Sequence, residues 1–244
     1  MADQELPLTE HLLELRNRLL RSLAAIAIVF LCLVYFANDI YLFFALPIQA
    51  LLPTGTSMIA TDVAAPFFAP FKLTIVVAGA ITAPYILFQL WSFVAPALYQ
   101  NERKLAVPLF ISSVVLFYLG IAFAYFVVFP LVFGFFTSVA PSGVAVTPDI
   151  NSYLSFILKL FIAFGLAFEI PVATVLVLRT GAMSSDQLAS KRPYVFLACF
   201  VFGMLLTPPD VISQSLLAIP AWLLFELGLI MDRYLLPQKK PKVD

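Results

Sequence analysis

The sequence predicts an all-α, polytopic membrane protein with six transmembrane helices and both termini on one side of the membrane. Of its 244 residues, 62% are hydrophobic and only 11% are charged, whereas soluble domains carry about 25% charged residues. A soluble domain of this length would need a polar exterior that this chain lacks. The other two observations are a series of long apolar stretches and an uneven distribution of basic residues.

Six apolar stretches are the predicted spans of a single membrane domain over residues 1–244. About 20 apolar residues cross a hydrocarbon core of about 30 Å as a helix. Four of the stretches reach or approach this length, whereas the fifth has only 13 residues. The predicted spans are residues 19–36, 71–95, 105–129, 153–178, 194–206 and 211–231.

The last two spans are joined by the short sequence Thr207-Pro208-Pro209-Asp210. Thr207 can cap a helix, Pro208 suits the first helical position, and Asp210 suits the positive end of the helix dipole. We therefore predict a short helical hairpin that crosses a locally thinned bilayer. A re-entrant hairpin is the alternative.

The basic residues give the orientation. Under six spans, 12 of the 14 Lys and Arg fall on one side, and the connections at 37–70, 130–152 and 207–210 contain none. The positive-inside rule then places both termini in the cytoplasm. The twelve are Arg16, Arg18, Arg21, Arg103, Lys104, Arg179, Lys191, Arg192, Arg233, Lys239, Lys240 and Lys242.

The sequence also argues against an enzyme. It contains no phosphate-binding loop, no G-x-S-x-G and no His-Glu-x-x-His. His11 is the only histidine, which excludes a His-rich metal site, and Cys32 and Cys199 are isolated within spans. We therefore expect no catalytic residue, no cofactor, no metal and no nucleic-acid partner.

Two acidic residues lie beside basic ones on the predicted cytoplasmic side. Glu14 belongs to an amphipathic helix that runs into the first span, and its pairing with Arg18 at i,i+4 is worth a few tenths of a kcal/mol. Glu102 precedes Arg103 and Lys104. From the residues alone, both acids have an ordinary interpretation as solvated surface charge.

Glu169 is different because it lies inside the fourth apolar stretch, ten residues from the nearest basic residue. An ionised carboxylate at that depth costs about 2.5–3.5 kcal/mol on insertion scales. It therefore needs a partner, a hydrated cavity or a retained proton. Pro171 bends the helix and frees a backbone carbonyl, which suits such a cavity. We interpret Glu169 as a functional residue.

Four motifs occur in order along the chain. They are HLLELRNRL at 11–19, FVAPALY at 93–99 followed by Glu102-Arg103, FEIP at 168–171, and LLTPPD at 205–210. Together they resemble the TatC family, the large multi-spanning subunit of the twin-arginine protein translocase. The resemblance covers nearly the whole chain, from about residue 8 to 234.

The resemblance implies a glove-like concave bundle in the bacterial inner membrane. It implies a receptor that binds twin-arginine signal peptides at the cytoplasmic face and exports folded proteins with the protonmotive force. The implied partners are those precursors, TatA-like and TatB-like single-span subunits, further copies of the chain, and membrane lipid. A carboxylate accepts a guanidinium fork bidentately, so two acids suit two arginines.

The resemblance also implies roles for individual residues. Glu14, Glu102, Arg16 and Phe93 would form the signal-peptide site, and Glu169 would be the buried acid of the concave face. Met204, Thr207 and Gln214 would lie where partner helices dock, and Pro47 in an outer cap.

Two other functions remain open from the sequence. The first is a proton-coupled secondary transporter of a small solute, with Glu169 as its proton site; it predicts an inverted repeat, which the sequence lacks. The second is a membrane scaffold without a ligand.

Overall fold

The computed structural model describes residues 8–51, 58–94, 106–139, 147–206 and 211–235, and nearly all of them are helical. This confirms the predicted all-α class. The chain forms two compact units, which are described separately. Unit 1 comprises Met1–Ala97 and Thr147–Leu154, and unit 2 comprises Leu98–Val146 and Ser155–Asp244.

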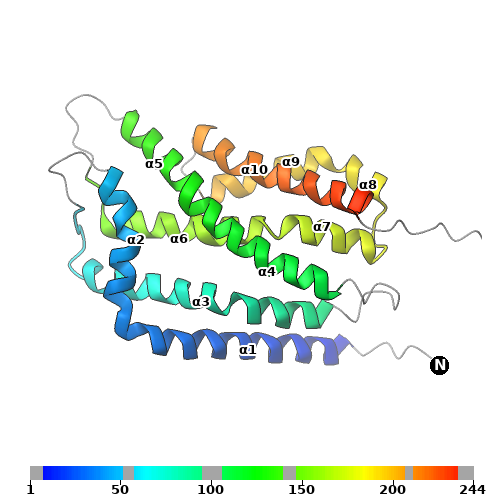
Figure 1. Ribbon diagram of the computed structural model, residues 1–244, viewed down its shortest axis with the longest axis horizontal. Coiled ribbons are helices and arrows are strands. Elements are labelled where there is room, and N and C mark those ends of the chain that lie inside the picture. Colours follow the sequence, from blue (N-terminus) through cyan, green and yellow to red (C-terminus); the bar gives the residue numbers. More distant parts are fainter. Residues whose placement is uncertain (1–7, 52–57, 95–105, 140–146, 207–210, 236–244) are drawn as a thin grey trace, which may run out of the picture. The chain divides into compact units, whose positions relative to one another are not determined.

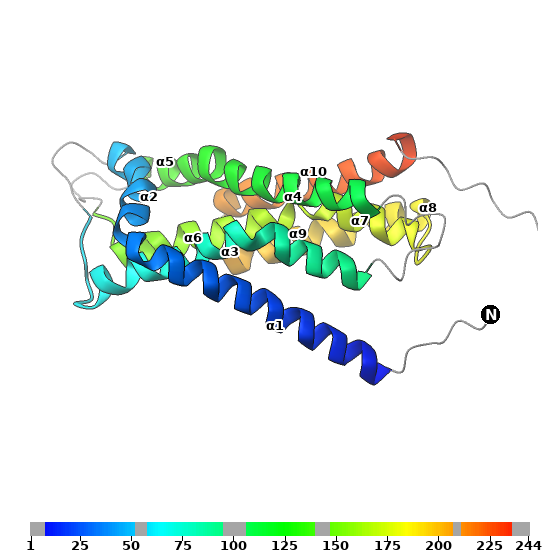
Figure 2. The same cartoon turned by 60° about the horizontal axis from the view of Figure 1, so that its bottom comes forward.

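Unit 1 contains three helices: α1 (Leu8–Leu33), α2 (Ala37–Leu51) and α3 (Ala65–Val94). A 3₁₀ turn, Val34–Phe36, separates α1 from α2. Figure 1 shows that α2 turns steeply away from α1, while α1 runs alongside α3 in both Figure 1 and Figure 2. Much of the predicted first outer connection is therefore helical.

Buried hydroxyl groups in α3 hydrogen-bond to the helix backbone. Thr74 donates to the Pro70 carbonyl and Thr82 to the Ala78 carbonyl, each at 2.8 Å. A polar group in an apolar environment is costly unless it is hydrogen-bonded, and bonding to the carbonyl four residues earlier meets that need within the helix. The apolar stretch therefore tolerates both threonines.

At the other end of unit 1, Asp149 joins two segments that are far apart in the sequence. Its Oδ1 accepts hydrogen bonds from the Thr61 amide (3.1 Å) and hydroxyl (2.8 Å), and its Oδ2 accepts from the Ser152 amide at 2.9 Å. An isolated bridge pairs Ile59 with Asp149. The hydrogen bond from the Ser152 amide and those from Thr61 lower the pKa of Asp149 to about 2.

Unit 2 contains a continuous helical rod and a group of shorter helices. In the rod, a π turn at Ala124–Val128 precedes Pro130, whose missing N–H and bulky ring a regular α-helix does not accommodate. The chain ends its described part in a second π turn, Met231–Leu235. The helices are α4 (Ala106–Phe123), α5 (Phe129–Ser138), α6 (Ile150–Ala167, whose residues up to Leu154 belong to unit 1), α7 (Ile170–Arg179), α8 (Ser185–Ser190), α9 (Arg192–Leu206) and α10 (Val211–Ile230).

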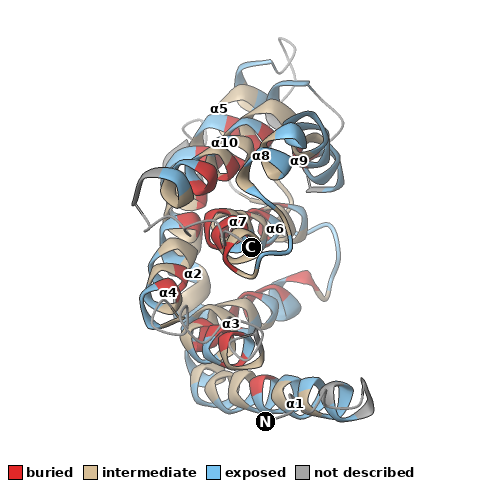
Figure 3. Cartoon of the chain, turned by 90° about the vertical axis from the view of Figure 1, so that its right-hand side faces the viewer, coloured by how far each residue is buried: buried red, intermediate tan, exposed pale blue. Residues whose placement is uncertain are grey.

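The core of unit 2 depends on close helix packing at glycines. A Cβ at Gly120 of α4 would lie 2.3 Å from the Phe164 carbonyl oxygen of α6. A Cβ at Gly228 of α10 would lie 2.7 Å from the Thr174 Cβ of α7. Small residues let helix backbones approach closely in membrane proteins. Figure 3 shows the resulting buried surface on α7 and α10.

Five helical segments are long and apolar enough to cross a membrane, and Arg192–Leu205 is a shorter apolar helix. These six segments correspond in order to the six predicted spans, and most extend further than the apolar stretches. At about 1.5 Å per residue, the 15 residues of α9 reach about 22 Å, less than a hydrocarbon core of about 30 Å. The chain is thus a multi-pass membrane protein, while the six-span count stays a prediction.

Candidate functional site

Glu14 lies on α1 and is paired with Arg18, one helical turn further along. Arg18 Nε lies 2.9 Å and Nη2 lies 2.5 Å from the same carboxylate oxygen, Oε1. The Glu14 side chain is 36% exposed and that of Arg18 is 21% exposed. The predicted i,i+4 pair is confirmed.

Arg18 also joins α1 to the end of α3. Its Nη1 donates to the Gln89 side-chain oxygen at 3.2 Å, and its Nη2 lies 3.3 Å from the Ser92 carbonyl oxygen. The last four carbonyls of a helix have no partner within the helix and favour a positive charge. Arg18 therefore acts as a cation at the C-terminus of α3.

An open hollow on α1 surrounds this pair. It is lined by Glu10, Leu13, Glu14, Asn17, Arg18 and Arg21. Glu14 Oε2 has no hydrogen-bond partner among the residues that the structure describes. The hollow thus presents one carboxylate oxygen to an incoming donor.

The other predicted members of this site have varied positions. Arg16 is exposed on α1, with its Nη2 3.4 Å from the Asn17 side-chain oxygen. Phe93 is half-buried in the last turn of α3, next to Ser92. Glu102 lies outside the described residues. Within unit 1, Glu14 and the end of α3 that carries Phe93 are brought together through Arg18.

Gln89 is a residue of this site that the sequence analysis missed. It is buried on α3 and accepts a hydrogen bond from Arg18. Its signal in the sequence was an uncharged polar side chain near the end of an apolar stretch. Such a residue needs a hydrogen-bond partner in that environment.

Glu169 lies at the break between α6 and α7. Pro171 has no N–H, so the Ala167 carbonyl loses its helical partner. The Glu169 amide donates to the Leu166 carbonyl at 3.1 Å, three residues earlier and not four, so the turn is tighter here. Helix α7 then begins at Ile170. The helix is thus interrupted just before Pro171, and Glu169 is the N-cap residue of α7.

The Glu169 carboxyl is only partly satisfied. It receives a hydrogen bond from the side chain of Ser113, a buried residue of α4. Its Oε1 is buried and has no hydrogen-bond partner among the described residues. A buried polar atom without a partner costs about 1–3 kcal/mol. Stability alone therefore does not explain the presence of this acid.

The hairpin of α9 and α10 carries two of the three predicted docking residues. Met204 is 53% exposed on α9. Gln214 on α10 donates its side-chain amide to the Phe200 carbonyl at 2.8 Å, so it links the two helices. Thr207 lies outside the described residues. Pro47 belongs to α2, and its side chain is likewise outside them.

Two ion pairs connect helical segments of unit 2 to one another. Arg192 pairs with both oxygens of Glu226, with Nε–Oε1 at 2.6 Å and Nη2–Oε2 at 2.8 Å. Arg179 pairs with Asp232 at 2.9 Å. The first pair links α9 to α10, and the second links α7 to the final π turn. Glu226 of α10 is thus a partner of Arg192.

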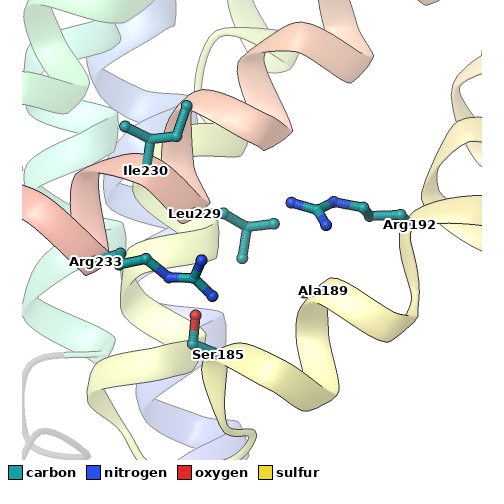
Figure 4. Close-up of a pocket in the computed structure, with 6 residues that line it drawn as sticks. All are labelled: Ser185, Ala189, Arg192, Leu229, Ile230 and Arg233. Carbon is teal, nitrogen blue, oxygen red and sulfur yellow. The ribbon is translucent and has the colours of Figure 1, made fainter.

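A small pocket lies between these segments, and Figure 4 shows its lining. Arg192 and Arg233 point toward it from two helical segments, and Arg233 lies 3.7 Å from Asp186. Because both guanidinium groups already have carboxylate partners, the pocket is better explained as a braced helix junction than as a ligand site. Its lining residues are Ser185, Ala189, Arg192, Leu229, Ile230 and Arg233.

Comparison with known proteins gives a consistent result. The sequence profile of the Sec-independent protein translocase protein, TatC, matches residues 10–220. The Sec-independent protein translocase protein TatC of Escherichia coli K12 is 59% identical over 228 residues, 93% of this chain and 88% of the relative. The protein of that name from Haemophilus influenzae is 56% identical over 236 residues, 97% of this chain and 92% of the relative.

The same likeness holds in three dimensions. A crystal structure of the twin-arginine translocase receptor TatC superposes with a TM-score of 0.81 at 38% identity. The match covers 91% of this chain and 98% of that one. These relatives are named as protein translocase components, which favours that function over a solute transporter.

The fold is that of a multi-pass helical membrane protein, and the relatives place it in the protein-transport class. The chain belongs to the TatC family.

Proposed function

We propose that this chain is the signal-peptide receptor of a twin-arginine translocase. It binds the consecutive arginines of a precursor through Glu14 and Glu102. The observation that carries this proposal is that Glu14 already accepts two guanidinium N–H groups on Oε1, while Oε2 has no hydrogen-bond partner among the described residues. The twin-arginine translocase receptor TatC, similar over 91% of this chain, supports it.

The proposed receptor lies in a bacterial inner membrane with both termini in the cytoplasm. This orientation is supported by the 12 basic residues that six spans place on one side. It uses the protonmotive force to export folded proteins and catalyses no covalent reaction. Its partners are TatA-like and TatB-like single-span subunits, further copies of the chain, and membrane lipid.

Partner helices are proposed to dock on the α9–α10 hairpin around Met204. Exposed apolar side chains on α9, including Leu197 and Val201, continue the same helix surface. Since Gln214 is bonded to Phe200, its proposed contribution is to fix the hairpin as well as to contact the partner. Glu169 is proposed to supply a polar site at depth, on the concave face of the bundle, and Pro47 to belong to an outer cap.

Site-specific photocrosslinking tests the receptor proposal. A photoreactive residue at Leu13, which lines the hollow beside Glu14, is expected to crosslink an Arg-Arg precursor and not its Lys-Lys counterpart. Leu31, about 27 Å further along α1 and also exposed, is the control position. Equal crosslinking of the two precursors at Leu13 would contradict the proposal.

A further inference from the structure

The pairing of Glu14 raises a question about ligand binding. The carboxylate that is proposed to receive the precursor's arginine is already paired with an arginine of its own helix. A second guanidinium can bind both carboxylate oxygens of Glu14 as a bidentate fork only if Arg18 releases Oε1. The binding-competent state of Glu14 is therefore a fraction of the total, and the apparent affinity falls by that fraction.

Arg18 has a second set of partners that does not involve Glu14. Its Nη1 contacts Gln89 Oε1 (3.2 Å) and the Gln89 carbonyl oxygen (3.5 Å), and its Nη2 contacts the Ser92 carbonyl oxygen (3.3 Å). These acceptors lie near the C-terminus of α3, where a cation is favoured. If Glu14 is taken by another arginine, Arg18 remains hydrogen-bonded to α3.

We propose that Arg18 is a resident competitor for Glu14, which sets the affinity of the site for arginine-bearing peptides. In the free protein, Arg18 is shared between Glu14 and the end of α3. When a peptide guanidinium binds Glu14, Arg18 stays on Gln89 and Ser92 alone. Arg18 thus acts as a positioning residue, and the inference rests on the proposed function of Glu14.

Replacing the guanidinium without changing the charge gives the sharpest test. Arg18→Lys keeps one positive charge but loses the fork, so it holds Glu14 less firmly. The dissociation constant of a labelled Arg-Arg signal peptide for the full chain in nanodiscs should fall by about threefold. Arg233→Lys is the control, because Arg233 is a half-exposed arginine that does not line this hollow. It should leave the constant unchanged.

A second variant predicts the opposite change. Gln89→Leu removes a side-chain acceptor that holds Arg18 on α3. Arg18 should then pair more firmly with Glu14, and the dissociation constant should rise. Thermal melting of each variant shows whether it is folded, and the two opposite signs distinguish competition from a general loosening of α1.

Repeating Arg18→Lys in a Glu14→Gln background separates this inference from the proposed function. Competition requires that the effect of Arg18→Lys disappear when Glu14 is absent. Equal effects in both backgrounds, or equal effects of Arg18→Lys and Arg233→Lys, would overturn the role of Arg18. If Glu14→Gln alone leaves Arg-Arg peptide binding unchanged, it is the proposed binding site that fails.

Discussion

Helix α1 and the α6–α7 pair are both long and apolar, yet different interactions hold them in the fold. In the segment that contains α1 and α2, only 6% of the most apolar window is buried within the chain. In the α6–α7 segment the value is 44%. Figure 3 shows the contrast, with α1 largely exposed and α7 largely buried.

Two kinds of interaction therefore hold the helices of this protein. The α6–α7 segment relies on packing: Leu160 and Phe164 are buried, and Phe164 lies close to Gly120 of α4. Helix α1 relies more on polar contacts, through Arg18 and the C-terminal end of α3. A helix that is held in this way keeps its sides open to lipid or to a partner.

The largest expected difference comes from a matched pair of leucine truncations. Leu160 on α6 is 0% exposed and Leu31 on α1 is 69% exposed. Leu160→Ala leaves a cavity and should lower the free energy of unfolding by about 2–5 kcal/mol. Leu31→Ala loses only contacts with lipid or detergent and should change it by less than about 0.5 kcal/mol. Unfolding in mild detergent measures both, and similar losses would contradict the comparison.

Glycine substitutions give the next largest effect, and substitution at a packed glycine should lower stability whereas substitution at an open one should not. Gly228→Ala forces a Cβ to within 2.7 Å of the Thr174 Cβ, so α10 must move away from α7. Overpacking of this kind typically costs about 1–3 kcal/mol. Gly79→Ala on α3 meets no atom within 4 Å, and alanine favours a helix by up to about 1 kcal/mol. Thermal melting should therefore show a lower Tm for the first and an unchanged or higher Tm for the second.

These packing details show where prediction from sequence stops. Local patterns predict the six apolar stretches, the helix interruption at Pro171 and the Glu14–Arg18 pair, because helix periodicity, proline and i,i+4 spacing all act within one segment. They do not predict Gln89 as a partner of Arg18, since this contact joins residues 71 positions apart. The roles of Gly120 and Gly228 also depend on which helices meet, which no local pattern contains.

Glu169 should respond in opposite directions in assays of stability and of function. Glu169→Leu removes a buried oxygen that lacks a partner among the described residues, so the chain should unfold no more easily and gain up to about 1 kcal/mol. Export of an Arg-Arg precursor should fall if the carboxyl supplies the proposed polar site. Ser113→Ala is the control that leaves the carboxyl in place. Unchanged export by Glu169→Leu would return this acid to a purely structural role.

The smallest predicted effect is a pH dependence of unit 1 that comes from Asp149. Its pKa in the folded chain is lowered to about 2 from an ordinary value of 3.8, chiefly by hydrogen bonds from the Ser152 and Thr61 amides. A lowered pKa means that the unfolded chain binds the proton more tightly, so this stabilisation is complete above about pH 4 and is lost as the pH falls toward 2. Melting curves of the wild type and Asp149→Asn should converge across this window. Asp62→Asn, whose carboxylate accepts only from the nearby Ala64 amide among the described residues, should stay parallel to the wild type. A difference in Tm between the wild type and Asp149→Asn that stays constant with pH would show that the charge of Asp149 does not contribute to stability.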